Sequence, residues 1–310
     1  MIATLKKIRN KIRANYKSKR LAKHYYRRIG RHIIPGDAAN ELIFKKVMAG
    51  DPCFITRFGS SELATILFFL EERQHDKSSV WNEHHQHILC DVSGFFPFTQ
   101  ESMDQFSKYY LDFIKNIDVL GVWNVGEENV ADFFSPGIQL VNLPAIEPYY
   151  FDNPWSRALA GKKVLVIHPF DKSINDQYLK RELLFANKNI LPAFDLKIIQ
   201  AVQTVADNTQ GFDDWFSALN FMYDEIVKQD FDVAIIGAGA YGMPLANFIK
   251  MKMGKTAIHM GGATQILFGI KGKRWHDFPK VKALFNEFWI SPSSSEHPDG
   301  AEKVEGGSYW

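Results

Sequence analysis

The stretch that decides the fold of this chain is residues 232–275, which read DVAIIGAGAYGMPLANFIKMKMGKTAIHMGGATQILFGIKGKRW. An apolar run from Val233 to Ile236 ends at a glycine-rich turn, and apolar residues then recur at helical spacing up to Gly254. A second short apolar run, Thr256 to His259, follows. The stretch therefore predicts a strand, a glycine turn, a helix and a second strand, which together are the repeating unit of a parallel α/β sheet.

The glycine turn has GxGxxG spacing, with Gly237, Gly239 and Gly242 as its glycines and Tyr241 before the last of them. Glycines allow a tight turn and let a phosphate approach the backbone N–H groups at the start of the following helix. A diphosphate is the ligand that best suits this geometry. The alternative is that the glycines only allow the strand and the helix to pack closely.

The end of the second strand bears on which nucleotide would bind. A dinucleotide-binding fingerprint carries an acidic residue about 20 residues further on, where it holds the ribose hydroxyls. Here the strand ends with His259, Met260, Gly261 and Gly262, and no acid is present. NAD is therefore disfavoured, and a nucleoside diphosphate that carries another group is favoured.

A compact group of cations follows that glycine pair. Its members are Lys271, Lys273 and Arg274. Cationic side chains at this spacing can neutralise a diphosphate, and a solvated basic turn is the alternative.

The composition is that of a globular protein. With 310 residues, 46% of them hydrophobic, the chain can bury a core of one large domain or two small ones. No window approaches 18 consecutive apolar residues and no signal peptide is evident, so a cytoplasmic location is expected. Cys53 and Cys90 lack CxxC spacing, which supports neither a disulfide scaffold nor a cysteine zinc site.

The charge is distributed unevenly along the chain. Residues 1–32 contain twelve Lys or Arg and no acid. The segment from residue 33 onward therefore contains the other 25 of the 37 basic residues and all 35 acidic residues. The rest of the chain carries about −10, which disfavours a nucleic-acid partner. Apolar residues of the arm recur every three to five positions, which predicts a helix suited to an anionic membrane surface. Packing on its own domain or on a partner subunit is the alternative.

A second strand-to-helix corner carries polar side chains. A short strand, residues 53–56, leads into RFGSSE at residues 57–62, and a helix with a serine cap is expected to begin at Ser60 or Ser61. Ligands of open α/β sheets bind beyond the carboxyl ends of the strands, so Arg57 and Glu62 are expected to face one cleft. The alternative is that Glu62 only stabilises the helix dipole.

His168 stands at a comparable place. It follows a predicted strand, residues 163–167, and precedes a loop and a predicted helix, residues 174–187. A histidine at a strand end is well placed for chemistry, although a structural histidine bonded to a loop is the alternative. Glu147 lies in a proline-bounded aromatic loop with no predicted role, and the histidines at 84, 85 and 87 have no convincing metal-ligand spacing.

The rest of the chain alternates helices with strands. Predicted helices cover residues 38–48, 101–116, 130–134 and 215–228, and predicted strands cover residues 119–123, 138–141 and 196–200. This alternation predicts an α/β domain with a mainly parallel sheet. The predicted organisation is a basic arm at 1–36, one α/β domain at 37–291 and a tail at 292–310.

Several short motifs of the chain together resemble those of a known family. RFGSSE matches the pattern RxGxxE and occurs with VIHPF, IGAGAYGMPLA, AIHMGG, FGIKGKRW and VEGGSYW. With these motifs, residues 40–310 resemble the bacterial GT-D-type glycosyltransferases that take part in the biosynthesis of surface polysaccharides, for example capsular polysaccharide. The resemblance implies a Rossmann-like domain, a nucleotide-sugar donor and a glycan or lipid-linked acceptor. Better-described members hold a divalent cation through an acidic pair near the corner where Ser60 and Ser61 stand here, so a role for Mg²⁺ or Mn²⁺ stays open.

The expected reaction is therefore transfer of a sugar from a nucleoside diphosphate sugar to an acceptor hydroxyl. Glu62 is the expected base or acceptor-orienting carboxylate, Arg57 its partner or a sugar ligand, and His168 a second candidate base. The expected donor site comprises Gly59, Gly237, Gly239, Tyr241, Gly242, His259, Gly261, Gly262, Lys271, Lys273 and Arg274. A non-catalytic nucleotide-binding scaffold and a nucleotide-dependent oxidoreductase are the alternatives, and homo-oligomer formation stays open. The arm would hold the enzyme at the inner face of the plasma membrane.

Overall fold

The computed structural model describes residues 32–76, 78–206 and 208–310, and a parallel β-sheet lies at the centre of this part of the chain. Within these residues the sheet has eight strands in the order β1-β4-β3-β2-β8-β7-β5-β6, and every pairing is parallel. The strands are β1 (Ile33–Ile34), β2 (Cys53–Thr56), β3 (Val119–Val122), β4 (Gln139–Asn142), β5 (Lys163–His168), β6 (Asp195–Gln200), β7 (Val233–Ile236) and β8 (Thr256–His259). The predicted α/β class with a Rossmann-like parallel sheet is confirmed.

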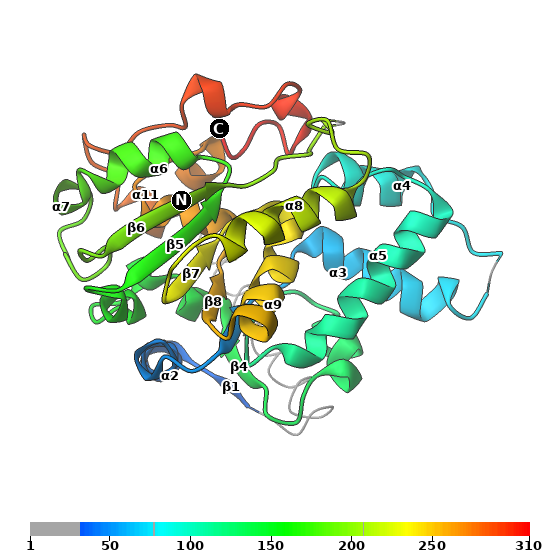
Figure 1. The fold of residues 1–310 in the computed structure, drawn as a ribbon, viewed down its shortest axis with the longest axis horizontal. Helices are drawn as coiled ribbons and strands as arrows, with labels where there is room; N and C mark the ends of the chain where they lie inside the picture. Colours follow the sequence, from blue (N-terminus) through cyan, green and yellow to red (C-terminus); the bar gives the residue numbers. More distant parts are fainter. Residues whose placement is uncertain (1–31, 77, 207) are drawn as a thin grey trace, which may run out of the picture.

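Helices cover both faces of this sheet. They are α2 (Gly36–Ala49), α3 (Ser60–Phe68), α4 (Glu83–Gln86), α5 (Gln100–Phe113), α6 (Asp171–Tyr178), α7 (Arg181–Leu184), α8 (Trp215–Val227), α9 (Gly242–Met253), α10 (Thr264–Leu267) and α11 (Pro279–Lys282). Alternate residues of a strand point to opposite faces. Phe54 accordingly packs with residues of α3, α5, α8 and α9, whereas Cys53 and Ile55 pack with residues of α2, α6 and α10. In Figure 1, α8 and α9 lie in front of the sheet.

Three local predictions differ from the structure. The N-cap of α3 is Gly59 and not a serine, because Ser60 is already helical and its hydroxyl donates to Asn124 Oδ1 at 3.2 Å. The helix predicted at 174–187 is interrupted after Tyr178, because the chain turns to bury Leu184 and Phe185 in the core. The helix predicted at 130–134 is a 3₁₀ segment, Glu127–Phe133.

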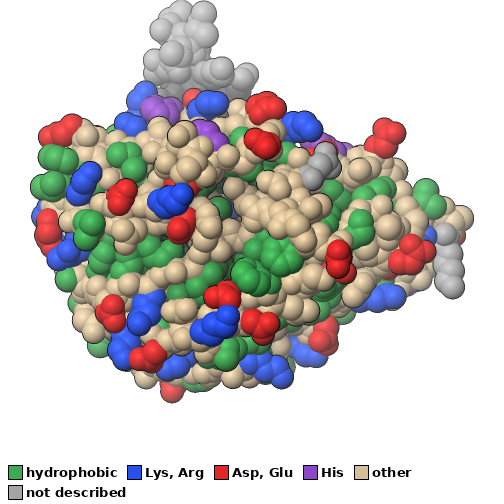
Figure 2. All heavy atoms as spheres, turned by 45° about the horizontal axis from the view of Figure 1, so that its top comes forward, with side chains coloured by type: hydrophobic (Ala, Val, Ile, Leu, Met, Phe, Trp, Pro, Cys, Tyr) green, Lys and Arg blue, Asp and Glu red, His purple; other side chains and the backbone are tan. Residues whose placement is uncertain are grey.

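The predicted tail, 292–310, packs on the α/β domain. The carboxylate of Glu296 accepts hydrogen bonds from the backbone N–H groups of Ser173 and Ser293, both at 2.9 Å, and from the Ser173 hydroxyl. Ser173 belongs to α6, and Figure 1 shows the tail, in red, beside α6 at the top of the view. Figure 2 turns this top forward and shows acidic and basic side chains interspersed on the face that it draws.

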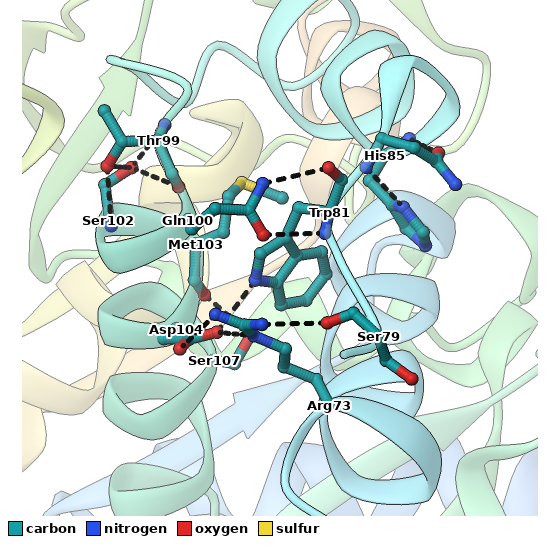
Figure 3. Close-up of polar contacts among 11 residues, drawn as sticks. Arg73, Ser79, Trp81, His85, Thr99, Gln100, Ser102, Met103, Asp104 and Ser107 are labelled. Carbon is teal, nitrogen blue, oxygen red and sulfur yellow. Dashed lines mark hydrogen bonds and ion pairs between the residues drawn. The ribbon is translucent and has the colours of Figure 1, made fainter. Parts of the chain in front are cut away.

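A polar network fixes the region around α4, where the sequence is rich in histidine and aromatic residues. Asp104 of α5 accepts from Arg73 Nε at 3.1 Å and from the Trp81 indole N–H at 2.8 Å (Figure 3). The side chain of Gln100 bonds both the N–H and the carbonyl of Trp81, each at 2.9 Å. These bonds join the π-helical turn Phe69–Arg73, which extends α3, to α5.

The predicted membrane-binding arm, residues 1–32, lies outside the described residues except for His32. None of the helices in the described part of the chain combines the length and the apolar character needed to cross a membrane.

Candidate functional site

A pocket lies at the carboxyl ends of the strands, where ligands of parallel α/β sheets bind. The loops that follow β2, β3, β5, β6, β7 and β8 line it, and so does the C-terminal tail. It encloses about 170 Å³. This volume is below the roughly 300–1,000 Å³ of typical ligand sites, so a nucleotide sugar would extend past its mouth.

The pocket gathers most of the side chains that the sequence singled out. Those that line it are Arg57, Gly59, Glu62, His168, Gly237, Gly239, Tyr241, His259, Gly261, Gly262 and Arg274. Gly242, Lys271 and Lys273 do not line it. A Cβ on Gly242 would lie 2.3 Å from His259 Nε2, so this glycine serves close packing, and Lys271 Nζ lies over the ring of Phe285 at 5.7 Å.

Glu62 and Gly59 fit together at the start of α3. Glu62 is in the first turn of the helix and is only 6% exposed. A Cβ on Gly59 would lie 1.6 Å from Glu62 Oε2, so the carboxylate occupies the space that the glycine leaves. Burial raises the pKa of Glu62, while its own backbone N–H and the Arg57 guanidinium act to lower it. Gly59 therefore allows a buried carboxyl group with a raised pKa to sit in the pocket.

Arg57 supplies positive charge without an ion-pair partner among the described residues. Its Nη1 donates to the carbonyl of Phe58 at 2.8 Å, and its guanidinium lies 5.3 Å from the centre of the Trp123 ring. The indole N–H of Trp123 donates to the same carbonyl at 2.8 Å. On the other side, a Cβ on Gly261 would lie 2.8 Å from Arg57 Nη2. The guanidinium is thus held in place with charge left for an anionic ligand.

His168 is a neutral hydrogen-bond donor in this arrangement. Its Nδ1 accepts the backbone N–H of Phe170 at 3.0 Å, which places the ring proton on Nε2. Burial lowers the pKa of His168 to about 3. Because its basic nitrogen is occupied, the geometry favours donation from Nε2 over the predicted alternative role as a base.

Comparison with known proteins gives no relative. No family model matches the chain, and no curated protein or solved structure matches it. The predicted membership of the GT-D-type family stays a prediction, and the function is argued from the pocket itself.

Two further predicted residues line the pocket but are fixed by the core. His259 Nδ1 lies 3.0 Å from the Thr56 hydroxyl, and burial, with Arg57 adding to it, lowers the pKa of His259 to about 3. Tyr241 shares a hydrogen bond of 2.7 Å with Thr204, and its ring stacks on Trp215 with centroids 4.9 Å apart. Both side chains shape the wall.

The glycine turn after β7 serves both packing and access. A Cβ on Gly237 would lie 2.7 Å from the Gly261 carbonyl and 2.7 Å from His168 Cδ2, so this position requires glycine for close packing. Gly239 has φ +51°, a left-handed conformation that favours glycine. The N–H of Ala240 donates to Ser93 and that of Tyr241 to Ala238. The N–H groups of Ala238 and Gly239 make no such bond within the described residues, so they are the donors left for a phosphate.

The tail forms a wall of the pocket that the sequence did not assign to the site. Tyr309 lies over Gly262, where a Cβ would be 2.5 Å from its ring, and its carbonyl lies where a Cβ on Gly272 would be, at 2.3 Å. The Arg274 guanidinium lies 4.6 Å from the centre of the Tyr309 ring. Gln265 Nε2 donates to the Tyr309 carbonyl at 3.3 Å. Gly262, which was predicted to belong to the donor site, therefore accommodates the Tyr309 ring, and Gly272 accommodates the Tyr309 backbone.

The described residues of the pocket do not form a binding site for the divalent cation that the family resemblance leaves open. Of the described residues that line the pocket, Glu62 and Glu305 are the acids, and Glu305 pairs with Arg274 at 3.2 Å. Among the described residues no three His, Cys, Asp or Glu side chains gather as metal ligands. No step is therefore assigned to a cation.

Proposed function

We propose that the protein is a glycosyltransferase that moves a sugar from a nucleoside diphosphate sugar to a hydroxyl of a glycan or lipid-linked acceptor. The observation that carries the proposal is that Arg57 and Glu62 line the same pocket at the carboxyl ends of the strands. One supplies charge with no ion-pair partner in the described part of the chain, and the other a buried carboxylate, in the same pocket. Transfer with a diphosphate leaving group needs both kinds of group.

The residues divide the chemistry between them. Glu62 accepts the proton of the acceptor hydroxyl. At the same time the oxygen of that hydroxyl forms a bond to the anomeric carbon of the donor sugar. The bond from that carbon to the diphosphate oxygen breaks, and the electron pair leaves with the diphosphate. Arg57 and the free N–H groups of Ala238 and Gly239 stabilise this negative charge, because they are fixed before the reaction begins. His168 donates its Nε2 proton in a hydrogen bond to a ligand oxygen.

A dinucleotide enzyme is disfavoured by the end of β8. His259 stands where a dinucleotide fingerprint carries its acid, and its ring is committed to Thr56 and Gly242. The pocket therefore lacks at this strand end the carboxylate that would hold a ribose.

Thermal-shift screening with UDP, GDP, ADP and dTDP sugars, and with NAD⁺ and NADH, tests the proposal. A ligand that binds only the native state at 100 times its Kd stabilises it by about 2.7 kcal/mol. We expect at least one nucleotide sugar to raise Tm and to release free nucleoside diphosphate on incubation. Arg57→Leu should abolish both effects.

Other results would decide against the proposal. Stabilisation by NAD⁺ or NADH alone would support the oxidoreductase. Stabilisation by a nucleotide sugar without nucleotide release, even with a broad mixture of acceptor glycosides, would support the binding scaffold.

A further inference from the structure

A second hollow adjoins the pocket. It encloses about 250 Å³ and lies between the loop that follows β6 and the tail. Pro169 and Gln203 line both the hollow and the pocket, so the two spaces meet there. Pro169 follows His168 in the chain, and His168 lines the pocket but not the hollow.

The lining of the hollow is polar, and the described residues that form it include no Lys or Arg. Its residues are Pro169, Gln200, Ala201, Gln203, Asn208, Gln210, Ser295, Glu296, His297, Pro298 and Asp299. Amides donate to and accept from hydroxyl groups, and carboxylates accept from them. Because the described lining has no Lys or Arg it does not suit a phosphate, and because it has few apolar side chains it does not suit a lipid chain. A neutral polyhydroxyl compound is the ligand class that this chemistry recognises.

Several of these polar groups are free to bind. Within the described part of the chain, the side chains of Gln200, Gln203 and Asp299 make no hydrogen bond. Gln210 Oε1 accepts the N–H of Gln203 at 3.3 Å, which leaves its NH₂ group available. The carboxylate of Glu296 is instead committed to fixing the tail, so it forms part of the frame.

Backbone strain accompanies the hollow. In the described residues, positive φ outside glycine occurs at Ala206 (55°), Gln210 (49°) and Glu305 (48°). The first two belong to the loop after β6, and the third to the tail segment that walls the pocket. Such conformations are unfavourable for residues with a side chain and cluster at ligand sites, because the surrounding structure must hold them in place. The loop of the hollow is thus held in a shape that its own residues disfavour.

We propose that this hollow binds the acceptor as a neutral carbohydrate, which rests on the proposed glycosyl transfer. The acceptor sugar lies among Gln200, Gln203, Gln210 and Asp299, and its reacting hydroxyl passes over Pro169 into the pocket. The donor occupies the pocket on the other side of that junction. Recognition of the acceptor thus uses its sugar and not a lipid chain.

Saturation-transfer NMR with neutral methyl hexopyranosides tests this site. The test variant is Gln200→Leu with Asp299→Ala, two exposed positions where substitution spares the core. The matched control is Gln74→Leu with Asp51→Ala, which are also exposed and line neither space. Methyl glucuronoside and farnesyl phosphate serve as anionic and lipid probes.

We expect at least one neutral glycoside to bind, the test variant to lower its signal at least fivefold, and the control to leave it unchanged. With an identified donor, the test variant should raise the acceptor KM at least tenfold while the nucleotide-sugar thermal shift and donor hydrolysis stay unchanged. No binding of any neutral glycoside, or binding that survives the test variant, would overturn the acceptor site and leave the proposed transfer standing. Glycoside binding that depends on Gln200 and Asp299, without a response to any nucleotide sugar, would support the carbohydrate site and overturn the proposed transfer.

Discussion

Gly59 links the conformation of one residue to the position of the carboxylate in the pocket. Its backbone, at φ −69° and ψ 147°, is open to any residue, so the glycine is needed for space and not for its dihedral angles. A methyl group there would overlap Glu62 Oε2. The identity of residue 59 therefore decides where the Glu62 carboxylate can lie.

Gly59→Ala should displace the Glu62 carboxylate without unfolding α3. If Glu62 is the base, turnover should fall by about 10²–10⁴-fold, the usual contribution of a general base. The Kd for the donor should change little, and measurement of kcat and Kd separates the two effects. Gly137→Ala is the control, because its Cβ would meet only Ser135 Oγ at 3.6 Å. Normal turnover in the Gly59 variant would remove the Glu62 carboxylate from the mechanism.

The pH dependence of turnover gives a second test of Glu62. Burial raises the pKa of this carboxyl above its ordinary value, and a base must be deprotonated to act. Turnover of the wild type should therefore fall as pH drops through that raised pKa. Glu62→Gln should retain donor binding, lose turnover and show no such acid limb in what activity is left. An unchanged acid limb in the variant would assign it to another group.

His168 makes a prediction about stability. Its pKa is about 3 in the folded protein and near 6.5 when unfolded, so the unfolded state binds more protons between these values. The contribution of the neutral His168 to stability is therefore fully present above pH 6.5 and declines as pH falls from there towards about 3. The stability advantage of the wild type over His168→Gln should shrink by about 1.4 kcal/mol per pH unit between pH 6 and 4.

Urea unfolding of both proteins at several pH values measures this difference. Other groups that titrate in this range, including Glu147, whose pKa burial raises to about 7, affect both proteins alike and cancel. His75→Gln, at an exposed position, is the control. Parallel curves for the wild type and His168→Gln would contradict a depressed pKa at His168.

At the scale of elements, the parts of the site on strand-to-helix corners were predictable from sequence. The corner from β2 to α3 brings Arg57 and Glu62 to the sheet edge, and the corner from β7 to α9 brings Gly239, because apolar strand runs and helical periodicity are local signals. The wall made by the tail was not predictable. Tyr309 reaches Gly262 and Gly272 through tertiary packing, and no periodicity in the tail marks that contact.

The same limit applies to the predicted group of cations. The three cations lie within four positions of the sequence: Lys271, Lys273 and Arg274. Of these three, only Arg274 lines the pocket. Its guanidinium contacts the Tyr309 ring and the Glu305 carboxylate. Their partners lie in the tail or at Phe285, which sequence spacing does not reveal. Likewise, GxGxxG spacing did not show that Gly242 packs against His259.

The attachment of the tail can be tested at Glu296. Glu296→Ala leaves the N–H groups of Ser173 and Ser293 without their acceptor, which costs about 1–3 kcal/mol. The tail should then be cleaved faster by limited proteolysis, and donor affinity should fall because the Tyr309 wall is loosened. Glu302→Ala, at an exposed position of the same tail, should change neither. Unchanged donor affinity with a released tail would show that the wall does not contact the donor.

At the scale of the whole molecule, charge separates the arm from the rest. Twelve cations without an acid stand in residues 1–32, and about −10 is left for the remainder. Among the described residues on the face that Figure 2 draws, charged side chains of both signs are interspersed and form no continuous basic surface. If the protein binds such a membrane, the arm is the segment whose composition suits it.

Deletion of residues 1–32 should abolish binding to vesicles that contain anionic lipid, with donor hydrolysis and transfer to a soluble acceptor nearly unchanged. Wild-type binding should weaken steeply with salt, since the attraction is screened over about 8–10 Å at physiological ionic strength. A variant that keeps all twelve cations but carries serine at Leu5, Ile8 and Ile12 separates charge from the apolar stripe. It should bind more weakly than the wild type, because an interfacial helix also buries its apolar face. Aggregation or a lowered Tm of the truncated protein would instead assign the arm to packing on the α/β domain, and the membrane role would then be abandoned.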